Sequence, residues 1–282
     1  VGSEMCIRDS LYIGSEGTLG VVTSATIKLM PLPKAKTDLL VLFPDVQSAI
    51  EVVPMIVSKL GIVPTSVEFM DRLSVETSCK YLNEHLTYEN CGSMLLIEVD
   101  GTTQDQVDGE AETIGDLCME NKAIEVYVAD NYTTQERVWA VRRNIAEAFK
   151  LYSPHQSLED IVVPIAQIPA LMEEIAKLSA EFQISMPSYG HAGDGNLHTT
   201  LIKPPEMPLD QWYRLEDQVV RRLYAVVMAL GGKLSGEHGI GIKRKDYYQE
   251  IADPREIALM RLLKKALDPN NILNPGKVFD LD

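Results

Sequence analysis

Short apolar runs alternate with longer segments whose apolar residues recur every three or four positions over most of the chain. The first pattern is typical of strands and the second of amphipathic helices. Asp45 is expected to cap a helix that ends at Gly61, because an N-capping carboxylate and a glycine flank a run of helical period. Further strands are expected at residues 38–43, 65–70, 93–99, 123–129 and 157–163. Further helices are expected at residues 71–82, 102–122, 132–151, 167–182, 209–230 and 254–267.

The order of these elements predicts an α+β fold. Residues 37–129 contain two rounds of strand–helix–strand of similar length, which indicates a duplicated ferredoxin-like arrangement, an antiparallel sheet covered by helices. The sequence itself shows no repeat that would confirm the duplication. Ahead of these rounds, the alternating segment Val21–Leu29 predicts one more strand, closed by prolines. Residues 1–10 do not match the pattern that begins at Leu11 and are interpreted as a foreign leader.

The charge and the apolar runs limit the partners. A net charge of −15 argues against nucleic acid and against anionic membrane surfaces. An acidic protein that handles an anionic substrate needs local cations, so an arginine within a site would matter. No apolar run approaches the length of a membrane span, and no secretory signal opens the chain. We expect a cytoplasmic protein without an integral membrane segment, either free or peripheral to the inner face of the membrane.

The cysteine pattern indicates thiols that play no part in the chemistry. Cys6, Cys79, Cys91 and Cys118 are scattered and form no Cys-x-x-Cys pair. Reduced and mostly buried side chains are therefore expected. An iron–sulfur centre needs a cluster of cysteines, so any such electron relay would have to lie on another chain or in a fused segment.

The candidate chemistry gathers in two glycine-rich stretches, His191–His198 and Ser235–Gly239, which hold three of the five histidines. An apolar strand ends at the first histidine of the earlier stretch and resumes just before the last one. This pattern predicts a sharp hairpin or bulge with a histidine on each side. Gly193 and Gly195 between them would allow unusual backbone angles and the close approach of another group.

These side chains form a candidate metal site. The imidazoles of His191 and His198 with the carboxylate of Glu237 would make a three-ligand site, with a fourth position open for substrate. Zinc is the expected ion, with manganese and iron as alternatives. His238 would then be a base beside the metal, since its ordinary pKa lies close to working pH. The alternative is that both hairpin histidines are structural residues without a ligand.

Four motifs carry a family resemblance, namely Gly14–Gly20 (GSEGTLG), His191–His198 (HAGDGNLH), Ser235–Gly239 (SGEHG) and Asn271–Lys277 (NILNPGK). In this order they resemble the FAD-linked oxidases of the vanillyl-alcohol-oxidase type. Within that type the chain is similar to the glycolate oxidase flavoprotein subunit, D-lactate dehydrogenase and D-2-hydroxyglutarate dehydrogenase. The resemblance implies an FAD-dependent enzyme that oxidises a D-2-hydroxy acid of the lactate, glycolate or 2-hydroxyglutarate type to the 2-oxo acid.

The resemblance also implies a domain organisation. After the leader at 1–10, residues 11–34 correspond to the C-terminal remnant of an FAD-binding domain, 35–267 to the FAD-linked oxidase C-terminal (substrate or cap) domain, and 268–282 to a tail that returns to the flavin. The implied FAD contacts are Gly14, Ser15, Glu16, Gly17, Thr18, Gly20, Val22 and Asn274. Because the main pyrophosphate-binding loops of the family are not in this chain, we expect it to bind FAD weakly and to be inactive by itself.

Substrate contacts are implied in the same way. Arg142, in a Trp-x-x-Arg pattern, matches an arginine that clamps the substrate carboxylate, a task that suits the planar guanidinium. His238 would take the hydroxyl proton and Asn196 would donate a hydrogen bond to the substrate. Leu158 stands where several relatives have a lysine that adds to the clamp, and Ala146 stands where the hydroxyglutarate enzymes have a threonine. Both departures argue against a straightforward hydroxyglutarate enzyme and leave the identity of the hydroxy acid open.

The sequence leaves two alternative functions open, and it does not identify the electron acceptor. The same histidines and glutamate could serve a metal-dependent hydrolase, or the ferredoxin-like pattern could form a non-catalytic ligand-binding module. In the resembled family, electrons pass to an electron-transfer flavoprotein, an iron–sulfur subunit or a quinone.

Arg261, Lys264 and Lys265 are expected on the solvent face of the last helix.

Overall fold

The computed structural model describes residues 10–86, 88 and 90–281 and divides the chain into two compact units. Residues 31–233 form the larger unit, and residues 1–30 with 234–282 form the smaller one. Residues 1–9, which include Cys6 and all of the expected leader except Ser10, lie outside the described residues.

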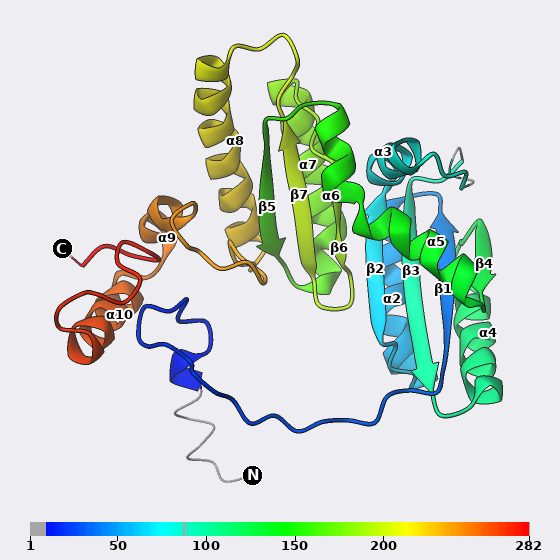
Figure 1. Ribbon diagram of the computed structural model, residues 1–282. Coiled ribbons are helices and arrows are strands. Elements are labelled where there is room, and N and C mark those ends of the chain that lie inside the picture. Colours follow the sequence, from blue (N-terminus) through cyan, green and yellow to red (C-terminus); the bar gives the residue numbers. More distant parts are fainter. Residues whose placement is uncertain (1–9, 87, 89, 282) are drawn as a thin grey trace. The chain divides into compact units, whose positions relative to one another are not determined.

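The larger unit contains a seven-stranded antiparallel sheet with the strand order β4-β1-β3-β2-β6-β7-β5 (Figure 1). The strands are β1 (Ala35–Phe43), β2 (Ser66–Asp71), β3 (Ser93–Gly101), β4 (Glu125–Ala129), β5 (Gln156–Val162), β6 (Ser188–His191) and β7 (Asn196–Ile202). Its α-helices are α2 (Val46–Leu60), α3 (Arg72–Leu82), α4 (Gln104–Glu120), α5 (Tyr132–Arg143), α6 (Ile145–Ala148), α7 (Ile168–Phe182) and α8 (Leu209–Ala229).

The sheet confirms the predicted fold class. The order β4-β1-β3-β2 with α2 and α4 is one ferredoxin-like half, so the two strand–helix–strand rounds at 37–129 together make a single half. The order β6-β7-β5 with α7 and α8 repeats the same arrangement further along the chain. Its fourth strand is reduced to a bridge between Val162 and Lys233. The duplication therefore lies in the topology and extends well beyond the stretch that indicated it.

Local capping explains where the helices begin and end. The Asp45 carboxylate accepts a hydrogen bond from Ser48 N at 2.7 Å, and Gly61 closes α2 in the left-handed conformation, as expected. The helix expected at 132–151 is instead divided at Asn144 into α5, α6 and a 3-10 turn (Phe149–Leu151). The Asn144 side chain donates to Ala140 O at 2.8 Å, a local bond that competes with regular helix.

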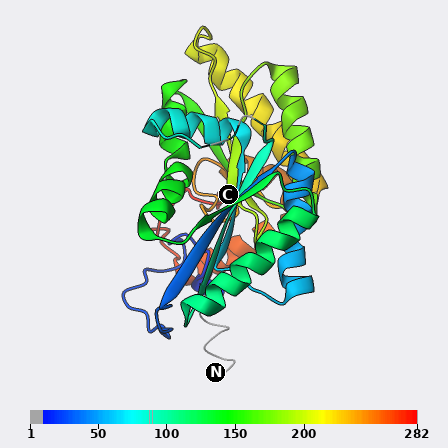
Figure 2. The ribbon, with the colours of Figure 1, turned by 90° about the vertical axis from the view of Figure 1, so that its right-hand side faces the viewer.

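The two faces of the sheet are covered by different helices. Figure 2 shows the sheet edge-on, with α2, α4, α7 and α8 on one side and α3 and α5 on the other. Because side chains alternate along a strand, residues of β1 contribute to both layers. The α3 and α5 side holds one apolar cluster, which includes Leu40, Leu42, Met94, Leu96, Val141, Ile145 and Phe149. The same face carries the ionisable residues of the candidate site.

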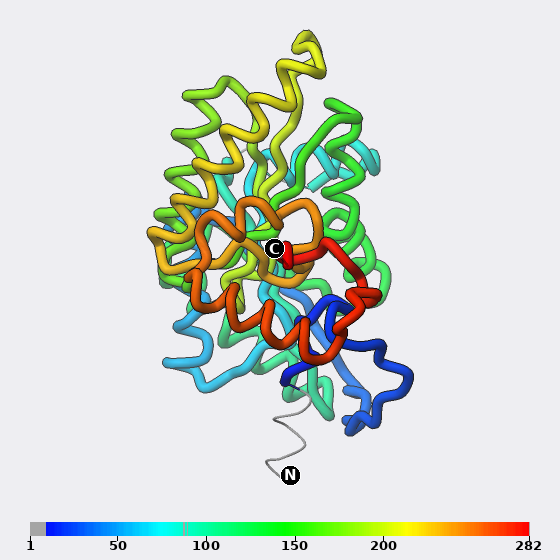
Figure 3. The backbone as a smooth tube through the Cα atoms, turned by 90° about the vertical axis from the view of Figure 1, so that its left-hand side faces the viewer, coloured from blue at the N-terminus to red at the C-terminus, as the bar shows by residue number. Residues whose placement is uncertain are grey.

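The smaller unit joins the N-terminal loop to the last two helices, α9 (Lys245–Ile251) and α10 (Pro254–Leu267) (Figure 3). Ile257, Val278 and Phe279 form its apolar core. The predicted strand Val21–Leu29 is wrong, since this segment has no strand pairing among the described residues and Val22 is 73% exposed. Alternation gives a strand its faces, but a strand also needs a hydrogen-bonding neighbour.

The expectation that Lys264 lies on the solvent face of the last helix is wrong. Its side chain is only 3% exposed, and its ammonium group donates to the Asp268 carboxylate and to the carbonyls of Thr18 and Leu273. Lys265 is exposed, as expected. The lysine therefore ties the helix to both the N-terminal loop and the C-terminal tail.

Among the described residues, none of the helices combines the length and apolarity that crossing a bilayer requires.

Candidate functional site

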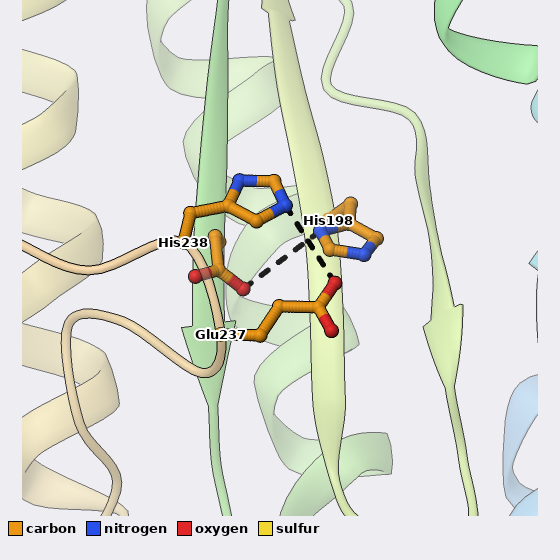
Figure 4. Close-up of side chains that lie close together, drawn as sticks. His198, Glu237 and His238 are labelled. Carbon is orange, nitrogen blue, oxygen red and sulfur yellow. Dashed lines mark ion pairs between the residues drawn. The ribbon is translucent and has the colours of Figure 1, made fainter. Parts of the chain in front are cut away.

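The hairpin between β6 and β7 places two histidines on one face of the sheet. His191 pairs in register with Asn196, and Tyr189 pairs with His198, so the two histidines are diagonal neighbours. Their ring centroids are 5.8 Å apart and the rings meet edge to face at 83°. Figure 4 shows His198 on β7. Imidazole side chains on one face of a sheet are of a type that binds divalent cations such as zinc.

Glu68 of β2 connects His191 to Arg142. Its Oε1 lies 2.7 Å from His191 Nδ1, and its Oε2 accepts from Arg142 Nε at 2.8 Å and lies 2.6 Å from Arg142 Nη2. Glu68 and His191 are register neighbours on β2 and β6, while Arg142 reaches the pair from α5. The structure thus brings the expected carboxylate clamp to one of the expected metal ligands through a third side chain.

Opposing effects act on the Glu68 carboxyl, which is 4% exposed. Burial by itself would raise the pKa of Glu68. The hydrogen bond with His191 and the charge of Arg142 outweigh burial and hold this pKa below its usual value. The group is therefore a carboxylate at neutral pH, and it compensates the buried guanidinium.

His198 has its own carboxylate and aromatic neighbours. Its Nδ1 lies 3.8 Å from Asp160 Oδ1 on β5, the residue beside it in register. The Tyr189 ring is 5.3 Å from the His198 ring, and the Arg142 guanidinium lies 4.8 Å from the Tyr189 ring centre. The contact between arginine and ring is a cation–π arrangement. Burial raises the pKa of Tyr189, which keeps the phenol neutral.

Asn196 lies in the larger unit, and so do Leu158 and Ala146, the two positions that depart from the family pattern. The Asn196 side chain is buried on β7, and its Oδ1 makes no hydrogen bond within the described residues. An unsatisfied buried amide beside the histidines suits a ligand contact. Leu158 is half-buried on β5, on the same face as Asp160, and Ala146 is exposed on α6, one turn after Arg142. Neither departure supplies a polar group to the site.

A cavity of about 540 Å³ opens beside His191 and Glu68. Apart from these two residues and Asp194, its lining is mostly small and apolar. It includes Val53, Pro54, Val57, Val63, Pro64, Val67 and Ile165. Such a space can hold an organic group next to the polar residues.

Glu237 and His238 lie in the smaller unit, on the segment that follows Leu234. The Ser235 hydroxyl accepts from Gly239 N at 2.8 Å and closes this segment into a tight turn. Figure 4 shows the two side chains, with His238 Nε2 3.6 Å from Glu237 Oε1. Both side chains are more than 40% exposed.

The predicted flavin contacts gather in the smaller unit from the two ends of the chain. The Glu16 carboxylate accepts from Ile240 N and Gly241 N, each at 2.7 Å, and Asn274 Nδ2 donates to the Glu16 carbonyl at 2.5 Å. Thr18 is buried and bonds back to Ser15 O. The Glu16 side chain therefore anchors the loop, which leaves its backbone as the part that can approach a cofactor. Val22 is exposed, in a segment that has no strand pairing among the described residues.

Glu68, Asp160 and Tyr189 were not singled out from the sequence. Glu68 and Asp160 are acids within apolar strand sequences, Val67–Met70 and Leu158–Val162. A buried carboxylate in such a run is costly unless it is paired, so each position carried a signal. The sequence could not supply the partner, since Glu68 is 123 residues from His191 and 74 from Arg142.

Comparison with known proteins agrees with this architecture. The family model described as FAD linked oxidases, C-terminal domain, matches residues 32–278. The chain is 36% identical to the glycolate oxidase subunit GlcD of Bacillus subtilis, over 96% of this chain and 57% of the relative. It is 34% identical to a D-lactate dehydrogenase of Anaerostipes hadrus, over 95% of this chain and 57% of the relative.

The chain thus spans little more than half the length of these curated relatives. Among solved structures, p-cresol methylhydroxylase with substrate bound has the same fold, with a TM-score of 0.65 at 18% identity over 90% of this chain and 54% of that one. The family match covers the larger unit from residue 32 and the C-terminal part of the smaller unit to residue 278. The chain belongs to the family of FAD-linked oxidase C-terminal domains.

Proposed function

We propose that the protein containing this chain is an FAD-dependent oxidoreductase that converts a D-2-hydroxy acid to the 2-oxo acid. The names of the relatives, a glycolate oxidase subunit and a D-lactate dehydrogenase, support this substrate class. The observation that carries the proposal is the group formed by His191, His198 and the Glu68–Arg142 pair. It combines two candidate metal ligands with a guanidinium suited to a carboxylate, the two recognition elements that a 2-hydroxy acid needs.

Each proposed residue has one task. Arg142 binds the substrate carboxylate through its planar fork, and the Tyr189 ring packs against the guanidinium. Asn196 directs its buried amide to the substrate. His238 accepts the proton of the hydroxyl oxygen while a hydride leaves the carbon that bears this hydroxyl, so the alcohol loses two electrons and two protons in total. This positioning fixes which hydrogen is transferred.

The proposed cofactor ligands are those of the glycine-rich motifs in the sequence. His191, His198 and Glu237 would bind the divalent cation, zinc first and manganese or iron as alternatives. The loop Gly14–Gly20 and Asn274 would contact FAD. When bound, the cation supplies polarisation of the substrate hydroxyl and the flavin supplies the hydride acceptor. An electron-transfer flavoprotein, an iron–sulfur subunit or a quinone would receive the electrons afterwards.

Elemental analysis of the purified chain tests the metal site first. We expect one equivalent of metal in the wild type and a loss of most of it in His198→Ala. His85→Ala is the matched control, because His85 is exposed and lies far along the chain from the hairpin. If neither the wild type nor the control carries metal after exposure to zinc, manganese and iron, the metal-assisted function is wrong.

The oxidoreductase assignment is tested in a flavin-loaded protein that contains this chain. Reduction of an artificial electron acceptor is measured with D-lactate, glycolate and D-2-hydroxyglutarate. His238→Gln is expected to lower kcat by about a hundredfold or more, as for loss of a general base. Hydrolysis of esters, amides or phosphates without any oxidation of hydroxy acids would favour the metal-dependent hydrolase instead.

A further inference from the structure

Glu68 divides its carboxylate between two residues of different function. Oε1 faces His191 Nδ1 at 2.7 Å, whereas Oε2 receives both contacts from the Arg142 guanidinium. The side chain is almost completely buried, on the face of the sheet that also carries His198. One oxygen therefore orients an imidazole and the other orients a guanidinium. Because the side chain is buried, each oxygen keeps its own partner.

The donor chemistry determines the state of the histidine ring. An ionised carboxylate only accepts hydrogen bonds, so the Nδ1 of His191 must carry the proton in this contact. In the neutral ring the lone pair then belongs to Nε2, the nitrogen on the other side. Metal-binding histidines commonly donate their second nitrogen to a carboxylate in this manner. If Glu68 served only to pair with Arg142 for stability, its contact with His191 would not be needed.

We propose that Glu68 is a positioning residue that prepares His191 for a divalent cation and, through its second oxygen, Arg142 for the substrate carboxylate. This inference rests on the proposed function, because it assigns those two ligands to the two residues. It adds a role for a side chain that itself contacts neither ligand. Strand β2 thereby sets the geometry of a site whose other members come from β6 and α5.

The variant Glu68→Gln separates this role from the filling of space. A glutamine has nearly the same shape but offers one oxygen and one NH₂ group. Arg142 can only donate and is always charged, so it requires the oxygen. The NH₂ group then faces His191 Nδ1, which must accept, and the ring proton moves to Nε2. The nitrogen needed by the cation becomes the protonated one.

Zinc affinity of the chain, measured by competition with a chromophoric chelator, is the main readout. We expect Glu68→Gln to bind Zn²⁺ about 10–100-fold more weakly than the wild type, the usual cost of losing such a partner. Glu98→Gln is the matched control. Glu98 lies on β3 on the same sheet face, largely buried and paired with Lys36 at 2.9 Å. Its loss removes a paired carboxylate but touches neither His191 nor Arg142, so zinc affinity should stay unchanged.

A second measurement reports on the ring itself and needs no metal. Nitrogen-15 NMR of the metal-free wild type at about pH 8, where an unperturbed imidazole is neutral, should show His191 protonated on Nδ1. The same spectrum of Glu68→Gln should show protonation on Nε2. An Nε2-protonated wild-type ring would overturn the proposal even if the variant failed to fold.

The outcomes distinguish this inference from the proposed function. If the wild type binds zinc and Glu68→Gln binds it as tightly as Glu98→Gln does, the role of Glu68 is refuted and the metal site stands. If the wild type binds no metal and His198→Ala makes no difference, the proposed function fails. Weak zinc binding by Glu68→Gln alone, together with the change of ring proton, supports the inference.

Discussion

The two central glycines of the hairpin, Gly193 and Gly195, should differ strongly in how much stability they lose when one methyl group is added. Gly195 adopts φ +84°, and a Cβ built on it would lie 2.0 Å from the carbonyl oxygen of Val163. That carbonyl belongs to a residue whose own N–H donates to Gly195 O at 3.1 Å, so the two backbones are held together. Gly193 lacks a positive φ, and its nearest neighbour to a new Cβ is Val67 at 3.9 Å.

The cost of Gly195→Ala can be worked from these two observations. A left-handed conformation costs a residue with a Cβ about 1–2 kcal/mol. A contact at 2.0 Å with backbone forces a shift like that of an overpacked core, about 1–3 kcal/mol. The sum is about 2–5 kcal/mol, or a melting temperature about 4–20 °C lower for a unit of this size. Gly193→Ala should change stability by less than about 1 kcal/mol, in either direction.

Thermal unfolding followed by circular dichroism, in the presence of a chelator, measures both variants without a contribution from bound metal. Zinc affinity should also fall in Gly195→Ala, because the hairpin carries His191 on one strand and His198 on the other. Similar melting temperatures for Gly195→Ala and Gly193→Ala would refute the reasoning, since the variants differ only in backbone angle and in the space available.

Two further predictions concern buried charges. Burial, the largest influence on Asp38, raises the pKa of this carboxyl from 3.8 to about 6. Folding therefore favours the protonated form, and the stability that is fully present below about pH 4 is lost as the pH rises to about 6. Asp38→Asn should remove most of this loss, as measured by urea unfolding at about pH 4 and pH 7; an unchanged pH dependence would contradict it. Lys264→Met should destabilise the smaller unit by about 3–5 kcal/mol, because the buried carboxylate of Asp268 loses its cationic partner and keeps only the N–H groups of Ile272 and Leu273. The exposed control Lys265→Met should have almost no effect on limited proteolysis, and equal cleavage of the two variants would argue against a buried tie.

Much of the fold could be predicted because its signals are local. The Asp45 cap and the Gly61 stop determine α2, and the spacing of apolar residues determines most other elements within a few positions. The hairpin between β6 and β7 was likewise predicted from its glycines and flanking apolar residues. Of the two glycines, however, only Gly195 needs the special angle and the close approach that were expected of both.

Predictions failed where the outcome depended on a distant neighbour. Val21–Leu29 has the alternation of a strand but no pairing partner among the described residues. Lys264 occupies a position of the last helix that composition assigns to solvent, yet carbonyls from both ends of the chain surround its ammonium group. Periodicity gives the face of an element and contains no information on what covers that face.

The sequence by itself determined the element order, the ferredoxin-like class, the family resemblance and the residues most suited to chemistry, including His191, His198 and Arg142. Those features follow from local propensity and from motifs that are continuous in the chain. Only the tertiary structure decided that Glu68 joins His191 to Arg142, and that Asp160 and Tyr189 flank His198. These contacts arise from strand order and register, since antiparallel pairing brings together residues that the chain separates widely.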